Sequence, residues 1–202
     1  MAKVASTPGA IGYVSLGSLS DSVKEVTVDG VEGTAENVKT GKYKISRPFN
    51  LCYYDGKLSK LAEDLINFIM SDEGQKTVDK EGYISVESGK SYKASGLKGK
   101  ITVAGSTSVA PLMNVIADEY KKLNPGVTIE IQESGSTAGI QSATEKAVDI
   151  GMSSRELKDD EAKTLATKKI AMDGIAVIVN KNNSIDNLTS DQIKSIYLGE
   201  TT

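Results

Sequence analysis

The sequence predicts an α/β fold with a mostly parallel sheet and flanking helices. From residue 100 onward, short β-rich runs alternate with helical patterns, and three of these runs end in glycine, serine and threonine clusters that open the next helix. The 202 residues are 39% hydrophobic, which is enough for ordinary globular cores. In folds of this class, ligands usually lie at the carboxyl ends of the strands.

The first half of the chain is predicted to contain mainly strands and one helix. Residues 8–16 are typical of a turn and a short strand, residues 23–31 of a second strand, and residues 43–54 of a long extended run. Apolar residues at helical spacing over 58–70 predict an amphipathic helix with Gly74 in or near its end. Residues 87–100 are polar, rich in lysine and glycine, and aperiodic, which predicts a flexible linker.

The second half is predicted to alternate regularly. The expected elements are a strand at 100–104, a helix at 110–123, a strand at 127–132, a helix near 138–147, a strand at 148–152, a helix near 159–167 and a long strand at 171–180. A last helix is expected after Thr189, whose spacing from Gln192 is that of a capping box, with Gly199 as its C-cap.

Composition excludes several classes of function. Lys+Arg 24 against Asp+Glu 27 gives a net charge of −3, so no general positive field exists to attract nucleic acid. The absence of histidine excludes histidine-based triads and histidine-ligated metal sites, and no metal or other cofactor is expected. The single cysteine, Cys52, lies in an apolar run and is expected to be a buried small hydrophobe. No apolar stretch approaches the ~20 residues of a membrane helix, and the first residues do not resemble a signal peptide.

Three hydroxyl-rich clusters point to a small anion as ligand. They are Gly105-Ser-Thr-Ser108, Ser134-Gly-Ser-Thr137 and Gly151-Met-Ser-Ser-Arg155. Each places N–H and hydroxyl donors at a predicted helix N-terminus, where orphan N–H groups and the macrodipole favour an anion. Each cluster taken alone could simply be an N-cap, but a cap needs one hydroxyl and these clusters supply several. No nucleotide-binding P-loop motif is present.

The charged residues near the clusters have alternative interpretations. Arg155 could offer a bidentate fork to the anion, or it could be a surface arginine paired with Glu156 or Asp159. Asp149 is expected to be structural. Arg47 is expected to be a solvated or inter-lobe residue.

Several segments together resemble one family. Residues 103–111, 133–140, 149–155, 173–180, 196–200 and 8–16 are similar to successive signatures of PstS, the extracytoplasmic phosphate-binding protein of the ABC phosphate importer. The resemblance implies a type II periplasmic-binding-protein fold, in which two α/β lobes close on one phosphate.

The order of these segments differs from the family's order. The segment expected late leads here, which indicates a circular permutation joined across residues 85–100, and the family's second-lobe Ser-Gly-Thr loop is absent. The resemblance implies a first lobe over 51–173 and an incomplete, truncated second lobe formed by 4–50 and 174–202.

The resemblance also implies the ligand residues. They are Thr107, Ser108, Ser136, Thr137, Ser154 and Arg155. Ser154 stands where some members have an aspartate that accepts the phosphate proton.

The main hypothesis is therefore a non-enzymatic binding protein for inorganic phosphate that works with the membrane permease of an ABC importer outside the cytoplasm. We expect weak binding, because part of the second lobe is missing, and a homo-oligomer formed through that lobe. The alternatives are an engineered fragment for folding without significant ligand binding and, with less support, a phosphatase.

Overall fold

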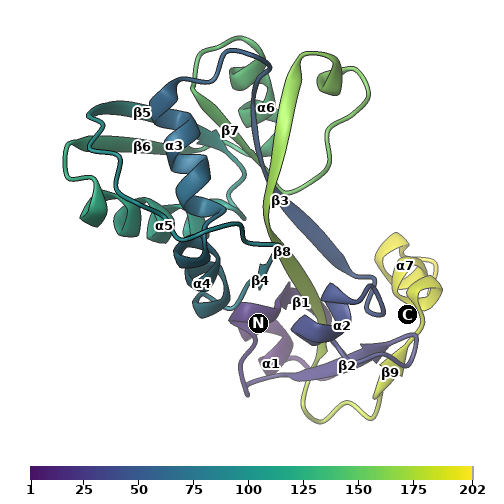
Figure 1. Ribbon diagram of the computed structural model, residues 1–202. Helices are drawn as coiled ribbons and strands as arrows, with labels where there is room; N and C mark the ends of the chain where they lie inside the picture. Colours follow the sequence, from purple (N-terminus) through teal and green to yellow (C-terminus); the bar gives the residue numbers. More distant parts are fainter. Residues whose placement is uncertain (202) are drawn as a thin grey trace. The chain divides into compact units, whose positions relative to one another are not determined.

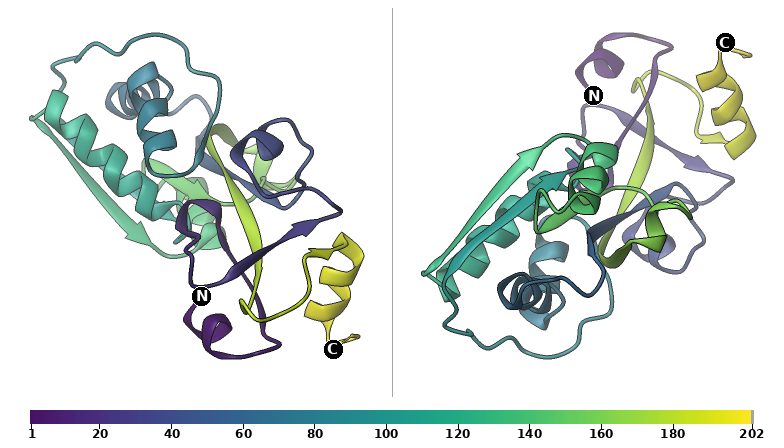
Figure 2. Two further views of the ribbon diagram at one scale, coloured as in Figure 1. Left: turned by 90° about the horizontal axis from the view of Figure 1, so that it is seen from below. Right: turned by 90° about the horizontal axis from the view of Figure 1, so that it is seen from above.

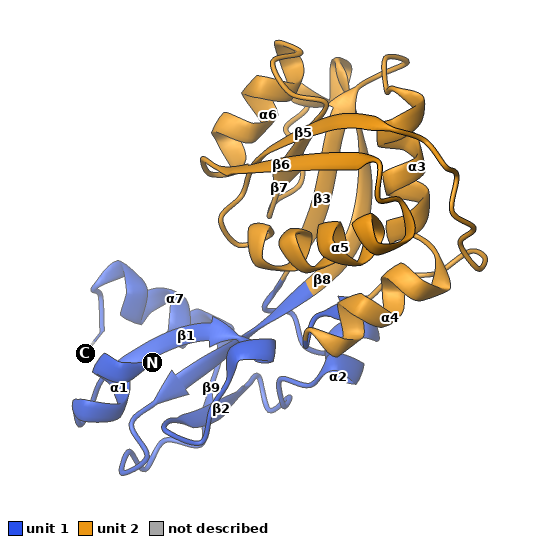
Figure 3. Ribbon diagram, turned by 90° about the vertical axis from the view of Figure 1, so that its left-hand side faces the viewer, with its two compact units in different colours: residues 1–46, 82–84, 173–202 blue, residues 47–81, 85–172 orange. Residues whose placement is uncertain are grey.

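A computed structural model describes residues 1–201 and divides the chain into two compact units (Figure 3). Unit 1 comprises Met1–Ser46, Gly82–Ile84 and Asp173–Thr202, and unit 2 comprises Arg47–Glu81 and Ser85–Met172. Two long strands, β3 (Ser46–Tyr54) and β8 (Leu165–Val179), contain residues of both units.

The sheet of unit 2 aligns three strand ends. Strand β5 (Gly99–Gly105) runs parallel to both β6 (Val127–Glu133) and β7 (Ile150–Ser153), and β3 is antiparallel to β7. The register pairs Gly105 with Glu133 on one side and with Met152 on the other. The turns that follow the three strands therefore begin at the same edge of the sheet, as the sequence predicted.

Helices cover both faces of this sheet (Figures 1 and 2). Helices α3 (Lys60–Ile69) and α5 (Ala110–Leu123) lie on one face, and α6 (Ser136–Thr144) lies on the other. Helix α5 buries one stripe of its side chains, namely Leu112, Met113, Ile116, Ala117 and Tyr120. Helix α6 packs Ile140 and Ala143 against Cys52 and Leu165. Cys52 is fully buried, as predicted, and burial raises the pKa of its thiol to about 12.

The segment 86–98, which we call the strap, has no helix or strand and yet is tied to unit 2. The backbone N–H of Tyr92 donates to Glu73 at 2.8 Å, and the Tyr92 hydroxyl donates to Asp64 at 2.7 Å. The N–H of Gly89 donates to the carbonyl of Met70. The strap is thus anchored by tyrosine and carboxylate contacts, which the linker prediction did not include.

Unit 1 is a smaller assembly around the second half of β8. Strands β1 (Ile11–Ser15) and β2 (Lys24–Val28) pair antiparallel with β8, and the short strand β9 (Asn187–Leu188) pairs parallel with β2. The remaining elements are α1 (Ala2–Ser6), η1 (Leu16–Ser18), α2 (Ala35–Lys39) and α7 (Ser190–Leu198). The pairing in the protein is therefore mixed. The antiparallel pairs are those of β8 with β1 and β2 and that of β3 with β7, and the other pairs named above are parallel.

Several element predictions need correction. The helix expected near 159–167 is wrong: only the short η2 turn (Glu161–Lys163) forms before β8 begins at Leu165. Gly74 does not end the preceding helix. It lies in the first turn of a further helix, α4 (Asp72–Lys80), whose N-cap Ser71 accepts the N–H of Gly74 at 3.2 Å. Helices α1 and α2 and the two-residue strand β4 (Ile84–Ser85) were not expected either.

Across residues 1–201, none of the helices has the length and apolar character needed to cross a lipid bilayer. The same residues contain no group of three or more Cys, Asp or Glu side chains arranged to hold a metal ion.

Candidate functional site

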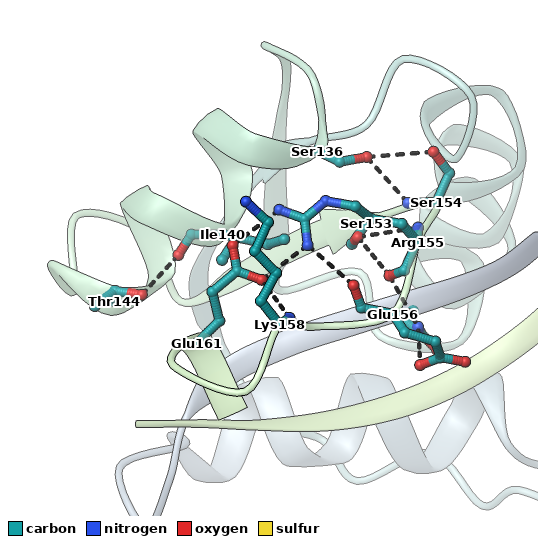
Figure 4. Close-up of polar contacts among 10 residues, drawn as sticks. Ser136, Ile140, Thr144, Ser153, Ser154, Arg155, Glu156, Lys158 and Glu161 are labelled. Carbon is teal, nitrogen blue, oxygen red and sulfur yellow. Dashed lines mark hydrogen bonds and ion pairs between the residues drawn. The ribbon is translucent and has the colours of Figure 1, made fainter. Parts of the chain in front are cut away.

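The predicted clusters meet at the carboxyl edge of the unit 2 sheet. The carbonyl of Gly105 accepts the N–H groups of both Ser134 and Gly135 at 2.9 Å, which ties the turn after β6 to the end of β5. The Ser136 hydroxyl accepts the N–H of Ser154 at 3.1 Å, and the two hydroxyl oxygens of this pair lie 3.2 Å apart. Side chains 18 positions apart in the sequence are therefore in direct contact (Figure 4).

Glycine makes this close arrangement possible. Gly139 of α6 lies directly on the sheet, because a Cβ there would be 2.4 Å from Gly105 Cα and 2.6 Å from the carbonyl oxygen of Ala104. A Cβ on Gly151 would be 2.6 Å from the carbonyl oxygen of Gly139. Since these three glycines have no side chains, α6 approaches β5 and β7 closely, and its first turn reaches the strand ends.

Helices α5 and α6 both begin in hydroxyl-rich sequence, and only one hydroxyl there makes a capping bond: Ser106 Oγ accepts the N–H of Ser108 at 3.2 Å in the turn that leads into α5. The N-cap positions are Val109 for α5 and Gly135 for α6, and neither makes a side-chain capping bond. In contrast, helices α2, α3, α4 and α7 are capped by the side chains of Thr34, Ser59, Ser71 and Thr189. The alternative interpretation of the clusters as ordinary N-caps therefore accounts for Ser106 but not for the other hydroxyls of the two clusters.

The cluster retains a surplus of donors. Among residues 1–201, no acceptor contacts the backbone N–H groups of Thr107, Ser136 and Thr137 or the hydroxyls of Thr107, Ser108 and Thr137. Thr107 and Thr137 are exposed, and Ser108 and Ser136 are half-buried. These donors lie at the positive ends of two helix dipoles, so the edge is suited to a small oxyanion.

Two buried polar residues that were not predicted as ligand residues hold the turn after β7, and one of them, Ser153, belongs to the third hydroxyl-rich cluster. The Ser153 hydroxyl donates to the carbonyl of Arg155 at 2.8 Å and accepts its N–H at 3.2 Å. The side-chain amide of Asn50 donates to the same carbonyl at 3.2 Å. Asn50 is 2% exposed and Ser153 is fully buried. Asn50 could have been recognised from the sequence as a buried polar residue, because it is an asparagine inside the apolar run of residues 49–54.

The Arg155 side chain is engaged by a carboxylate (Figure 4). Its Nη1 and Nη2 atoms each donate to one oxygen of Glu161 at 2.8 Å, and Nη1 also donates to the carbonyl of Glu156 at 2.9 Å. The pairing predicted with Glu156 or Asp159 thus forms with Glu161 instead. Because Glu161 occupies the outer edge of the guanidinium, only the edge with Nε and one Nη2 hydrogen is left for another acceptor.

Asp149 also has a structural partner. Its Oδ2 accepts the N–H of Thr102 at 2.7 Å and the hydroxyl of Thr102 at 2.8 Å, which joins β7 to β5. This is the structural role expected for Asp149.

The Arg155–Glu161 pair predicts acid-dependent stability. The Arg155 guanidinium and the N–H of Lys158 lower the pKa of Glu161 from 4.5 to about 2. A carboxyl whose folded pKa is depressed contributes stability above its unfolded pKa, and that contribution is lost as the pH falls from about 4.5 towards 2. After allowance for solvent screening, we expect Glu161→Gln to lower the unfolding free energy by about 1–2 kcal/mol at pH 7.

Urea unfolding of the native chain and of Glu161→Gln between pH 7 and pH 2.5 measures this difference. It should shrink as the pH falls below about 4.5. A difference that stays constant over this range would show that the Glu161 charge contributes no stability.

The chain is similar in sequence to one family model and to several known proteins. A family model described as "PBP superfamily domain" matches residues 90–202. "Phosphate-binding protein PstS 2" of Streptococcus agalactiae serotype V is 47% identical over 200 residues, covering 98% of this chain and 68% of the relative. The protein of the same name from Streptococcus pneumoniae serotype 4 is 43% identical and covers 100% of this chain and 69% of the relative.

A solved structure agrees with these matches. The crystal structure of a phosphate ABC transporter, phosphate-binding protein from Streptococcus pneumoniae TIGR4 superimposes with a TM-score of 0.92 at 44% identity. It covers 100% of this chain and 78% of that chain. The family resemblance and the α/β fold class predicted from the sequence are confirmed. The permuted order of the segments stays a prediction.

Proposed function

Because this chain belongs to the PstS family of phosphate-binding proteins, we propose that it binds inorganic phosphate as the substrate-binding protein of an ABC importer. One observation carries this proposal: helices α5 and α6 begin in clusters that contain more hydroxyls than capping uses, since only Ser106 makes a capping bond there. Their free N–H and hydroxyl donors are available to the oxygens of a phosphate.

We assign the ligand contacts within unit 2 to six residues. Thr107 and Ser108 supply donors from the turn before α5, Ser136 and Thr137 supply them from the first turn of α6, and Ser154 completes the edge after β7. Arg155 contributes positive charge and its remaining Nε edge, because Glu161 holds the other edge. The site needs no metal or cofactor.

Two substitutions test the assignment. Thr107→Val and Ser136→Ala each remove a hydroxyl that can donate to a charged ligand. A hydrogen bond of this kind contributes about 1.5–3 kcal/mol, so each variant should bind phosphate roughly 10- to 150-fold more weakly by calorimetry. Matched controls are Thr128→Val on the exposed side of β6 and Ser142→Ala within α6, whose affinities should not change.

Unchanged phosphate affinity in both variants would show that the binding site lies elsewhere. If the unaltered chain gave no heat with millimolar phosphate, the alternative of a fragment without significant ligand binding would replace this proposal. The phosphatase hypothesis has no support, since family members are binding proteins and the chain has no histidine.

The family also supports an extracytoplasmic location and a membrane permease as partner for this chain. We include both in the proposal. Pull-down of the detergent-solubilised permease by the tagged chain would test the partner.

We also propose that the chain forms a homo-oligomer through unit 1. A groove of about 250 Å³ in unit 1 is lined only by apolar surface, from Tyr13, Ile45, Ile175, Val177, Ile193 and Tyr197. Tyr13 is 65% exposed and Tyr197 is 49% exposed, although their rings contact each other edge to face. A second copy that covers this groove would remove the exposed apolar surface from water.

Light scattering after gel filtration tests the oligomer. The mass at tens of micromolar should exceed the 21.4 kDa of one chain, and Tyr197→Asp should return it to that value. A single-chain mass for the unaltered protein would contradict the oligomer and leave the phosphate proposal intact.

A further inference from the structure

One carboxylate oxygen of unit 1 is buried without a partner. Glu25 lies on β2, and its Oε1 atom is excluded from solvent and accepts no hydrogen bond from any group among residues 1–201. A charged oxygen is costly to bury in this way, because the hydrogen bonds that water gives it in the unfolded chain are not replaced. The arrangement therefore favours the neutral, protonated form of the carboxyl.

The surroundings of this oxygen are uncharged and closely packed. A Cβ added to Gly33 would overlap Glu25 Oε1 and would lie 3.2 Å from Tyr43 Cζ and 3.3 Å from Leu16 Cδ2. The backbone of Gly33, the Tyr43 ring and Leu16 thus lie close around the carboxyl. Tyr43 is 1% exposed, and its hydroxyl donates its one hydrogen to the carbonyl of Ile175 at 2.8 Å, so that hydrogen does not neutralise Glu25.

The charged groups around β2 do not neutralise Glu25 either. Glu32, in the turn that follows β2, is also negative and disfavours a charge on Glu25. Lys24 Nζ binds Asp186 at 2.9 Å, and no Lys or Arg among residues 1–201 forms an ion pair with Glu25. Opposite β2, residues 177–179 of β8 are apolar. The other charged side chains near β2 in the sequence or on the segments joined to it are exposed, namely Asp29, Glu36, Lys39, Lys44 and Asp186.

The direction of the proton linkage follows from these contacts. Burial, followed by the Glu32 carboxylate, raises the pKa of Glu25 above its ordinary value of 4.5, although the N–H of Gly33 acts in the opposite direction. A raised folded pKa gives stability that is fully present below about pH 4.5 and is lost as the pH rises through the folded pKa. Glu161 in unit 2 has the opposite sign, because its pKa is lowered on folding.

We propose that Glu25 is a proton-operated switch in unit 1. In mild acid, a proton on Glu25 keeps the turn of residues 29–34 closed over the carboxyl. At higher pH the ionised carboxyl must be hydrated, and because the Gly33 backbone covers it, water can enter only if this turn opens. A metal ion would need more carboxylates than these two, and residues 1–201 contain no such group. The inference does not depend on the proposed function, since the assigned phosphate contacts belong to unit 2.

Hydrogen exchange of the full chain without phosphate tests the switch. After correction for the intrinsic exchange rate, amides of residues 24–34 should be at least about threefold better protected at pH 5 than at pH 7.5. Glu25→Gln keeps the shape and cannot ionise, so these amides should be equally protected at both pH values. Glu36→Gln, on the exposed side of α2, is the matched control and should keep the native pH dependence. Equal protection of the native chain at both pH values would overturn the switch, as would a pH dependence that persists in Glu25→Gln.

A titration of the native chain gives a test that does not rely on a variant that folds. The side-chain carboxyl carbon of Glu25, observed by carbon-13 NMR, should titrate above pH 4.5. Glu32→Gln removes the neighbouring charge and should lower this midpoint without abolishing the shift, because burial remains. A midpoint at or below 4.5 in the native chain would show that Glu25 is solvated, and the proposal would then be wrong.

Discussion

Gly139→Ala should destabilise unit 2 by about 3 kcal/mol or more and abolish phosphate binding. Alanine in place of glycine inside an exposed helix ordinarily stabilises by about 1 kcal/mol. Here the added methyl group would lie 2.4 Å from Gly105 Cα, 2.6 Å from the carbonyl oxygen of Ala104 and 3.1 Å from that of Met152. These are backbone atoms, so the methyl group can be accommodated only if α6 moves away from the sheet, and overpacking outweighs the gain in propensity.

The movement of α6 links this loss of stability to function. Ser136 is at the first position of the same helix, and its contact with Ser154 requires the close approach of α6 to β7. Urea unfolding and phosphate calorimetry on the same variant measure both effects. The matched control is Gly89→Ala, where the nearest atom to an added Cβ is the Met70 carbonyl oxygen at 4.0 Å, and its stability should stay within about 0.5 kcal/mol. Full stability of the Gly139 variant would contradict the close packing of α6.

Asp64→Ala should cost about 3–4 kcal/mol, because one carboxylate oxygen accepts three hydroxyl donors. Asp64 Oδ2 lies 2.6 Å from the hydroxyl of Tyr120, 2.7 Å from that of Tyr92 and 2.8 Å from that of Ser95. Burial, together with Asp64, raises the pKa of both tyrosines. The Tyr120 ring is fully buried, and its hydroxyl would lose a charged acceptor.

The same substitution should release the strap, since Tyr92 and Ser95 belong to it. Trypsin should then cleave the variant faster than the native chain at Lys90, Lys93 or Lys98. Asp64→Asn keeps an acceptor of the same shape and should lose less stability, and Tyr92→Phe removes one of the three bonds and should lose about 1 kcal/mol. Unchanged unfolding and proteolysis in Asp64→Ala would mean that the strap is held by its backbone contacts alone.

Errors in the element predictions have identifiable physical causes. Residues 159–167 have a helical composition, yet Glu161 pairs with Arg155 and Leu165 packs against Cys52 and Ile140, so the chain extends as β8 from Leu165 onward. Tertiary pairing overrides local propensity there. The α4 helix was not predicted although the sequence contains a signal for its start. Ser71 is a typical N-cap residue, and Asp72 and Glu73 form an acidic first turn.

Only part of the candidate site could be predicted from the sequence. Local pattern placed Thr107, Ser136 and Ser154 at strand-to-helix turns, and the parallel order of the strands brought those turns to one edge. The roles of Asn50, Ser153 and Glu161 were not predicted, because these residues act through contacts with side chains and backbone groups that only folding brings near.

The sequence alone determined the alternation of strands and helices, the hydroxyl clusters at the strand ends, the absence of histidine and the family resemblance, since periodicity, motifs and composition are local or additive properties. The tertiary structure decided which hydroxyls cap a helix and which stay free. It also decided that Gly105, Gly139 and Gly151 meet and that Arg155 is held by Glu161. These properties depend on distances between residues far apart in the chain, which are set by packing of the whole unit and not by any local stretch.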